Sequence, residues 1–555
     1  MNEPAAGMGG QPRIRHNDYS VLQVPETGRW APHRSLSVVI PAYRDQEKLD
    51  LTLASLAAQS YPAHLLEVVV VDDGSTPPLR LPEIVPERTR LVRGGEGGWG
   101  RAHACHTGAA VADGEIVHWL DCDMVLYREH VEAQARWHHL ADYLVVLGYK
   151  RFVDFSGGET SPAAVFEAVR TGAAGGLFDV ERSHPHEWVE KIIDESDGLR
   201  AFSPRTYRVH VGATASVPAE LLRRAGGMDD TLVLGEDTDL GFRLAQQGAV
   251  FVPEPEARSW HLGPSTVMRR REEVARHNEP YMSQLLPLRR DWRRSAGRQW
   301  LVPYVDVVVD ATDASSEAVR GSVAGVLAGP VHDIRVTVVG PWSKLGDERR
   351  SPLDDPLLDL RLTRAAFAHD GRVDYVESPP ATSAPAPYRL TVPAGWRPTA
   401  EALTRLVELA DSEGYGVVLA AVPDDDGLKV ARFERTAAIA RAEALRDDSE
   451  DLDQVVHELF GTFWLDGTEW ALAPATDVVK PASAVELEKW TREAKRWKKK
   501  ARQQEQEIEQ WQREAARLKR KVQAPLSEKL MDGARQRAAR IAGTSIVRRS
   551  PRDRD

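Results

Sequence analysis

Two aspartates separated by one residue carry the most chemical information in this chain. Asp121 and Asp123 flank Cys122 and follow the strand-like run 114–119. Side chains at positions i and i+2 of an extended segment share a face, so both carboxylates can reach one cation. Divalent cations such as Mg²⁺ bind hard oxygen ligands and keep other positions for water and substrate phosphates. The pattern indicates a metal and diphosphate site, although a carboxylate pair that caps a loop has the same sequence.

The aspartates follow one of three predicted strands. A β-branched run at 37–40 stops at Pro41, and apolar residues at helical spacing cover 49–59. A second apolar run, 66–71, ends in acidic and turn residues at 72–75. Strands that alternate with helices form a parallel sheet, and ligands bind beyond the carboxyl ends of such strands. The sequence therefore predicts an α/β fold with its polar clusters at one sheet edge.

Six motifs in this order resemble the family 2 glycosyltransferases of GT-A fold, over roughly residues 35–290. They are Val-Val-Ile-Pro-Ala-Tyr (38–43), Val-Val-Asp-Asp-Gly-Ser (70–75), Gly-Trp-Gly-Arg-Ala (98–102), Asp-Cys-Asp (121–123), Gly-Gly-Met-Asp-Asp (226–230) and Gly-Glu-Asp-Thr-Asp-Leu-Gly-Phe-Arg-Leu (235–244). The last block is similar to the galactosyltransferase-type carboxyl-terminal segment. One departure is Cys105-His106, where many members carry Arg-Asn, so the nucleotide contacts of that segment are open.

The resemblance implies a nucleotide-sugar donor, with uracil as the best-suited base. Asp73 would accept a hydrogen bond from the base, and Asp121 would face the ribose and the metal. Asp123 would bind Mn²⁺ or Mg²⁺ between the two phosphates, where the cation offsets charge on the leaving diphosphate. The implied donor-binding residues are Pro41, Ala42, Tyr43, Asp73, Arg101 and Asp121.

The resemblance also implies inverting chemistry with one general base. Asp237 would take the proton from an acceptor hydroxyl as it attacks the anomeric carbon. Glu236 would orient the acceptor or keep Asp237 in place. An acidic first turn that favours the helix dipole is the structural alternative for this pair.

A histidine and an arginine run follow the predicted last short strand, 249–252. In related GT-A enzymes a histidine near the position of His261 completes the metal shell, and imidazole suits Mn²⁺ better than Mg²⁺. Arg269, Arg270 and Arg271 would neutralise the diphosphate from a mobile loop, or form a solvated charge run.

Length and composition fit a multidomain enzyme. The chain has 555 residues, too many for one core. Its two cysteines indicate no disulfide framework, and no apolar stretch approaches the roughly 18 residues that span a bilayer. We therefore expect a cytoplasmic protein, or one at the inner face of the plasma membrane. The net charge of −11 argues against nucleic-acid binding by the body of the protein.

The organisation of the first domain recurs after residue 298. The run 304–310, a helical stretch 316–327 and the run 334–339 echo 37–71 in order and spacing. Gly340-Pro341 replaces Asp72-Asp73, and Pro393-Ala394-Gly395-Trp396 aligns with Asp121-Cys122-Asp123-Met124. We predict a second GT-A-like domain that lacks the acidic ligands and supports the first domain or holds an acceptor. An unrelated α/β domain is the alternative. The proline-rich stretch 379–387 is predicted to be a long loop.

The carboxyl-terminal segment has a different pattern. Apolar residues recur every seven positions from Leu487 to Val522, and Trp490, Trp497 and Trp511 lie three positions after members of that series. These are a and d positions of a coiled coil, which predicts a homo-oligomer. A single helix docked on its own body is the alternative. The basic tail could lie on anionic lipid or be disordered.

The predicted boundaries are a flexible segment 1–34, a catalytic domain 35–297, the second α/β domain 298–480, a coiled coil 484–523 and a basic tail 524–555. The predicted function is transfer of a sugar to a hydroxyl of a glycan or other acceptor, in cell-envelope, capsule or exopolysaccharide synthesis. The alternative is an inactive oligomeric scaffold. A nucleotidyltransferase would need a Gly-rich basic loop after the first strand, which Pro41-Ala42-Tyr43-Arg44 does not resemble.

Overall fold

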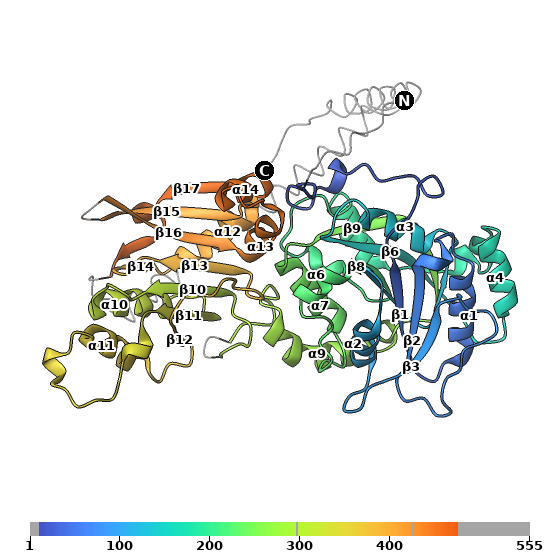
Figure 1. Cartoon of the computed structure of the whole chain (residues 1–555), viewed down its shortest axis with the longest axis horizontal. Helices are drawn as coiled ribbons and strands as arrows, with labels where there is room; N and C mark the ends of the chain where they lie inside the picture. The colour runs from blue at the N-terminus through green and yellow to red at the C-terminus, as the bar shows by residue number, and fades with distance from the viewer. Residues whose placement is uncertain (1–9, 296–297, 425–426, 476–555) are drawn as a thin grey trace, which may run out of the picture. The chain divides into compact units, whose positions relative to one another are not determined.

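A nine-stranded mixed sheet forms the first half of the protein (Figure 1). The computed structural model describes residues 10–295, 298–424 and 427–475. The strand order is β3-β2-β1-β4-β8-β6-β9-β5, and β7 pairs with β6. The strands are β1 (Leu36–Ala42), β2 (Leu66–Asp72), β3 (Thr89–Arg93), β4 (Ile116–Leu120), β5 (Met124–Leu126), β6 (Leu144–Val153), β7 (His184–Pro185), β8 (Thr214–Pro218) and β9 (Val250–Leu262).

Helices cover both faces of this sheet, as an α/β fold requires. Every residue of β1 is buried, and its side chains alternate between two cores. Val38 and Ile40 pack with Leu49 and Leu53 of α1, whereas Val39 packs on the opposite side with Ala102 of α2. The helices are α1 (Gln46–Ala57), α2 (Arg101–Val111), α3 (His130–His138), α4 (Pro162–Arg170), α5 (Glu187–Glu195), α6 (Ala219–Arg224), α7 (Glu236–Gln246), α8 (Thr266–Arg269) and α9 (Arg271–Leu285).

Strand directions decide which loops meet at the site. Strands β1, β2, β3 and β4 are parallel, so their carboxyl ends share one edge. Strand β8 is antiparallel to both β4 and β6, so β6 ends at the same edge as β4. The predicted meeting of the polar clusters at one edge is confirmed.

The last strand of this sheet is longer than the sequence predicts. A short strand at 249–252 was expected, with His261 after it; instead β9 runs from Val250 to Leu262 and contains His261. Because proline is rare inside sheets, Pro253 and Pro255 made the sequence prediction end the strand at residue 252. A register shift lets the chain continue: Gly148 of β6 pairs with Glu254, and Tyr149 pairs with Arg258.

The prediction of a flexible amino-terminal segment is wrong for residues 10–34. Ile14 is fully buried, and the Asn17 amide donates hydrogen bonds to the carbonyl oxygens of Leu199 and Phe251. The Trp30 indole donates to Glu132 at 2.9 Å. Scattered apolar residues without periodicity gave no sequence signal for this packing.

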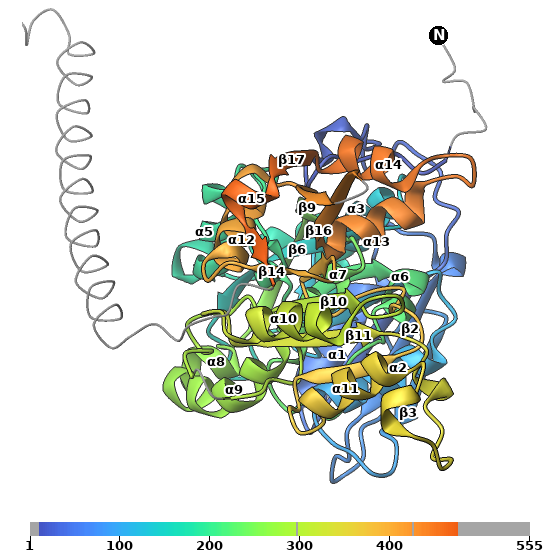
Figure 2. The ribbon, with the colours of Figure 1, turned by 90° about the vertical axis from the view of Figure 1, so that its left-hand side faces the viewer.

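A second sheet follows, with seven strands in the order β12-β11-β10-β13-β16-β15-β17 and a separate β14-β18 pair. Helix α10 packs on this sheet through Val319, Val323 and Val326 (Figure 2). Its strands are β10 (Val305–Asp310), β11 (Ile334–Val339), β12 (Val373–Val376), β13 (Tyr388–Val392), β14 (Trp396–Pro398), β15 (Val417–Asp424), β16 (Gly427–Arg435), β17 (Thr462–Asp466) and β18 (Leu472–Pro474); its helices are α10 (Ser316–Leu327), α11 (Leu358–Phe367), α12 (Ala402–Glu413), α13 (Thr436–Leu445), α14 (Leu452–Leu459) and α15 (Gly467–Trp470).

The second sheet repeats the topology of the first strand by strand. Strands β10 to β13 match β1 to β4 in order and in parallel sense. Strand β16 is antiparallel to β13 and β15, as β8 is to β4 and β6, and β17 is parallel to β15, as β9 is to β6. Seven strands of the second sheet thus have the order and directions that the predicted repeat requires.

The two aspartates of the β4–β5 loop have no acidic counterpart in the second sheet. The β4–β5 loop holds Asp121 and Asp123, whereas the β13–β14 loop holds Pro393, Ala394 and Gly395. Met124 pairs with His261 across β5 and β9, and Trp396 pairs with Pro474 across β14 and β18. The repeat therefore lacks the histidine as well as both aspartates.

Some predictions concern residues that the structure does not describe. The coiled coil at 484–523 and the basic tail at 524–555 lie outside the described ranges and remain predictions. Within the described ranges no helix is long and apolar enough to cross a bilayer. Cys105 and Cys122 are both free, as expected from the absence of a disulfide framework.

Three buried histidines, His118, His130 and His138, lie close to hydroxyl side chains of β8. His130 bonds to the Thr214 hydroxyl at 2.7 Å, and His138 bonds to the Ser216 hydroxyl at 2.8 Å. The rings of His118 and His130 are stacked, with centroids 5.5 Å apart. Burial lowers the pKa of His130 to about 4 and that of His138 to about 3.

These histidines predict a loss of stability in mild acid. His138 binds a proton near pH 6.5 in the unfolded chain but only near pH 3 in the folded protein. Its contribution to the free energy of unfolding is therefore fully present above pH 6.5 and is lost as the pH falls below that value. Between pH 7 and pH 5 the wild type should lose about 2 kcal/mol more unfolding free energy than His138→Gln. Urea unfolding at both pH values measures the difference, with exposed His64→Gln as control. Equal pH dependence in wild type and His138→Gln would contradict the prediction.

Candidate functional site

A cleft of about 360 Å³ opens at the carboxyl-terminal edge of the first sheet. It brings together all six residues that the sequence assigns to the donor and all three that it assigns to a metal. The lining residues are Pro41, Ala42, Tyr43, Asp45, Asp73, Arg101, Ala104, Asp121, Cys122, Asp123, His261, Pro264, Ser265, Thr266 and Arg269. Segments separated by more than two hundred residues thus form one pocket of ligand-binding size.

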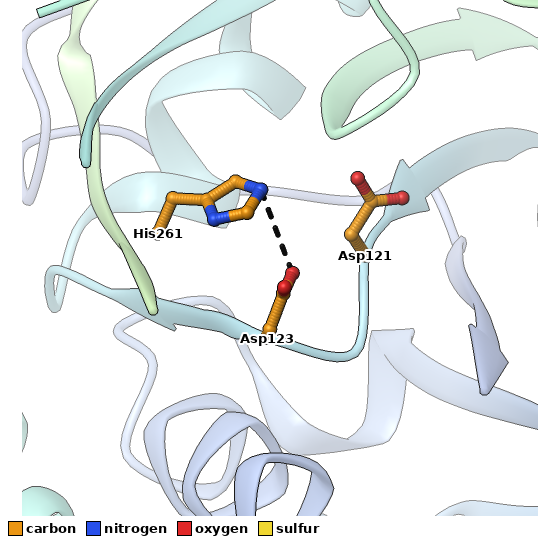
Figure 3. Close-up of side chains that lie close together, drawn as sticks. All are labelled: Asp121, Asp123 and His261. Carbon is orange, nitrogen blue, oxygen red and sulfur yellow. Dashed lines mark ion pairs between the residues drawn. The ribbon is translucent and has the colours of Figure 1, made fainter. Parts of the chain in front are cut away.

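Asp121 and Asp123 of the β4–β5 loop converge with His261 of β9 (Figure 3). One ligand atom from each lies within 4.8 Å of the others, and His261 Nε2 is 3.6 Å from Asp123 Oδ1. Backbone contacts fix the loop between β4 and β5: Leu262 N donates to the Asp123 carbonyl, and the Thr52 hydroxyl donates to the Cys122 carbonyl. The triad is therefore held by the sheet and by α1.

The donor set fits a divalent cation of Mn²⁺ or Mg²⁺ type. Burial, followed by the charge of Asp121, raises the pKa of Asp123 to about 7. The cationic side chains nearby therefore do not neutralise the two carboxylates, and a bound metal ion would. Lys48 Nζ is 3.9 Å from Asp123 and closer to Asp45, at 3.1 Å. Burial lowers the pKa of His261 to about 4, which leaves a neutral imidazole with a lone pair for a metal. Two carboxylates and a neutral imidazole suit such an ion.

The two acids at the end of β2 have different surroundings. Asp72 is buried and accepts from the backbone N–H groups of Ser75 and Leu79, so it shapes the turn. Asp73 lines the cleft and accepts from Gly100 N at 2.7 Å. The exposed ring of Tyr43 lies at the same end of the cleft, with the Arg44 guanidinium 4.7 Å from its centre.

Arg101 joins the metal triad to helix α7. Its Nε donates to Asp121 at 2.9 Å, and its Nη1 donates to Glu236 at 3.0 Å. Burial acts to raise the pKa of Asp121, but Arg101 and then His261 outweigh it, so that pKa is lowered. Burial, followed by Asp237, raises the pKa of Glu236 to about 7. A Cβ at Gly212 would lie 2.3 Å from Arg101 Nη2, so only glycine admits the guanidinium.

Asp237 lies in the first turn of α7, beside this bridge. Its Oδ2 accepts from Gly212 N at 3.3 Å, and its Oδ1 accepts from Thr238 N at 2.7 Å. The helix begins after Gly235, whose φ of +88° is a left-handed conformation. Asp237 is half-buried, whereas Glu236 is 5% exposed and engaged by Arg101.

Several site residues carried no signal in the sequence. Pro264, Ser265 and Thr266 line the cleft after β9, and Lys48 approaches Asp123 from α1. Of the arginine run only Arg269 lines the cleft; Arg270 pairs with Glu273, and Arg271 is exposed at the start of α9.

The Cys105-His106 departure does not disturb the cleft. Cys105 is fully buried in the core of the first domain. His106 bonds to the carbonyl oxygen of Met228 at 3.1 Å, so it fixes a neighbouring loop. Neither side chain belongs to the cleft lining.

Comparisons with known proteins relate this chain to glycosyltransferases. The family model "Glycosyl transferase family 2" matches residues 37–164. A chondroitin synthase of Escherichia coli is 25% identical over 360 residues, which cover 61% of this chain and 50% of that protein. A pre-mycofactocin glycosyltransferase of Mycobacterium tuberculosis is 30% identical over 230 residues, which cover 41% of this chain and 43% of that protein.

Among solved structures, a mannosyltransferase from Pyrobaculum calidifontis in complex with GDP-Man and Mn²⁺ matches 51% of this chain and 68% of its own, at 17% identity and a TM-score of 0.30. The chain spans at most half the length of the two relatives above. The matched family region contains β1, β2, β4 and the Asp121–Asp123 loop. Over residues 37–164 the chain thus matches the family 2 glycosyltransferases.

Proposed function

We propose that this protein is an inverting, metal-dependent glycosyltransferase that moves a sugar from a nucleotide-sugar to a hydroxyl of a glycan or other acceptor. One observation carries the proposal: a single cleft contains Asp73, the metal triad and Arg101, and Arg101 bonds to Glu236, the neighbour of the candidate general base Asp237. A uridine diphosphate sugar is the preferred donor.

The donor would lie along the cleft from Asp73 to Asp123. Asp73 has a second carboxylate oxygen that can accept a hydrogen bond from the nucleobase, and the ring of Tyr43 lines the same cleft. Asp121, Asp123 and His261 would hold the divalent cation, which supplies charge stabilisation for the leaving diphosphate. Arg269 enters the cleft from the far side and adds a positive charge there.

Asp237 is the better candidate for general base than Glu236. Arg101 occupies Glu236, and the raised pKa of Glu236 leaves it partly protonated near neutral pH. Asp237 is less buried and is oriented by two backbone N–H groups. It would accept the proton of the acceptor hydroxyl while that oxygen attacks the anomeric carbon opposite the diphosphate. Glu236 would then position Arg101 and Asp121.

Polysaccharide synthesis is the preferred setting, since one relative bears the name chondroitin synthase. The contrast between the two sheets supports an enzyme over an inactive scaffold. Asp73, Asp121 and Asp123 lie in loops of the first domain, whereas the repeat has Pro341, Pro393 and Gly395 at the corresponding positions.

The triad predicts one Mn²⁺ per chain in the presence of UDP. Isothermal titration calorimetry should give a single site, and Asp123→Asn should weaken it by about tenfold or more because a charged ligand is lost. Asp113→Asn is the matched control, since its side chain is 69% exposed at the opposite end of β4. A second site of equal affinity, or unchanged binding by Asp123→Asn, would contradict the assignment.

The general base predicts separate effects on binding and on transfer. Asp237→Asn should keep UDP and Mn²⁺ binding within about twofold and reduce sugar transfer by a factor of roughly 100 or more, since proton transfer is worth that much. Release of free nucleotide from a panel of nucleotide-sugars, with acceptor present, measures the rate. Loss of nucleotide binding in a still-folded Asp237→Asn protein would exclude the role.

A further inference from the structure

A buried lysine lies near the edge of the sheet that carries the cleft, and the proposed function gives it no role. Lys150 lies on β6 and is 5% exposed. Within the described residues its ammonium forms no hydrogen bond and no ion pair. Burying an ammonium without a partner costs free energy, so such a group indicates a ligand contact or a charge-balancing role.

The topology directs Lys150 toward the metal triad. Strand β6 runs in the direction of β4, so Lys150 is near the edge that carries Asp121. Lys150 and Phe152 are two residues apart and share a face of β6. Phe152 pairs directly with His261 across β6 and β9, and the two rings are 4.7 Å apart. The Lys150 side chain therefore extends on the face from which His261 meets the aspartates.

A row of rings continues from the triad to the surface on this side. The Phe152 ring lies 5.5 Å from that of His186, and His186 lies 5.2 Å from Trp188. Trp188 is 43% exposed. Apolar ring faces beside a hydrogen-bond donor are the surroundings that a pyranose ring requires, because a sugar presents C–H faces and hydroxyl edges.

Two carboxylates of the candidate site act on the charge of Lys150. Burial lowers the pKa of Lys150 to about 8, and Asp121 and then Asp237 are the strongest influences that oppose this shift. The transferred sugar must lie between these two aspartates, since its anomeric carbon leaves the diphosphate and receives the acceptor oxygen.

We propose that Lys150 binds the transferred sugar by donating hydrogen bonds to its oxygen atoms, and that the sugar lies beside the rings of Phe152 and His186. The inference rests on the proposed function and names a specificity-determining residue for it. The competing explanation is that Lys150 only balances the charge of Asp121 and Asp237. A sugar contact acts on the nucleotide-sugar alone, whereas charge balance acts on the metal–nucleotide as well.

Binding of UDP and of UDP-sugars to the full chain with Mn²⁺ separates these explanations. The wild type is first titrated with UDP-linked hexoses, N-acetylhexosamines and a hexuronate, and the tightest is kept. Lys150→Met should then bind that sugar nucleotide 10 to 100 times more weakly, the value of about one lost charged hydrogen bond. Its Kd for UDP should stay within about twofold. Lys191→Met is the control, because Lys191 is 71% exposed on α5.

Equal weakening of UDP and UDP-sugar, or no change in either, would overturn the proposal. A wild type that binds neither UDP nor any UDP-sugar with Mn²⁺ would instead refute the proposed function. If Lys150→Met fails to fold, deoxy analogues of the kept donor test the same contact on the wild type. Removal of one hydroxyl should cost the same 10- to 100-fold, and Lys150→Gln should be insensitive to that removal; equal loss in both proteins would contradict the contact.

Discussion

The Arg101 bridge between Asp121 and Glu236 is the interaction on which the site depends. Without it, four carboxylates would share one partly buried edge, and their repulsion would favour protonation or separation. The guanidinium keeps Asp121 ionised and fixes α7 against the end of β4. The bridge requires glycine at 212 because a side chain there would occupy the place of the guanidinium. The geometry of the acids is thus set by one cation, before any metal binds.

The repeated sheet separates what the fold requires from what the chemistry requires. Seven strands of each sheet follow the same order and directions, although the two halves share few polar residues at the strand ends, so burial of apolar strands is enough to specify this topology. The first half has Asp73, Asp121 and Asp123 after strands β2 and β4, where the second half has Pro341, Pro393 and Gly395. Pro474 at the position of His261 is informative, because proline can bind no metal there. Shared architecture alone therefore implies no shared activity.

Sequence patterns predicted the central elements well, because strands buried on both faces are continuous apolar runs. Helix α10 and strand β11 have the predicted bounds. Only the first residues of β9 were predicted, because its two prolines break the strand pattern. The register shift that lets the strand continue past them is visible only in the pairing with β6. The Asp121–Asp123 pair could be predicted from its spacing. Lys150 could not, since a single lysine in a strand gains meaning only from the side chains across the sheet.

The central claim is that Asp121, Asp123 and His261 form one cation site at which a nucleotide diphosphate binds. Anomalous diffraction from crystals grown with Mn²⁺ and UDP tests it most directly. One manganese peak is expected within bonding distance of Asp123 and His261, about 2.0–2.2 Å, with diphosphate oxygens completing the shell. A peak elsewhere, or nucleotide bound with no metal at these residues, would contradict it.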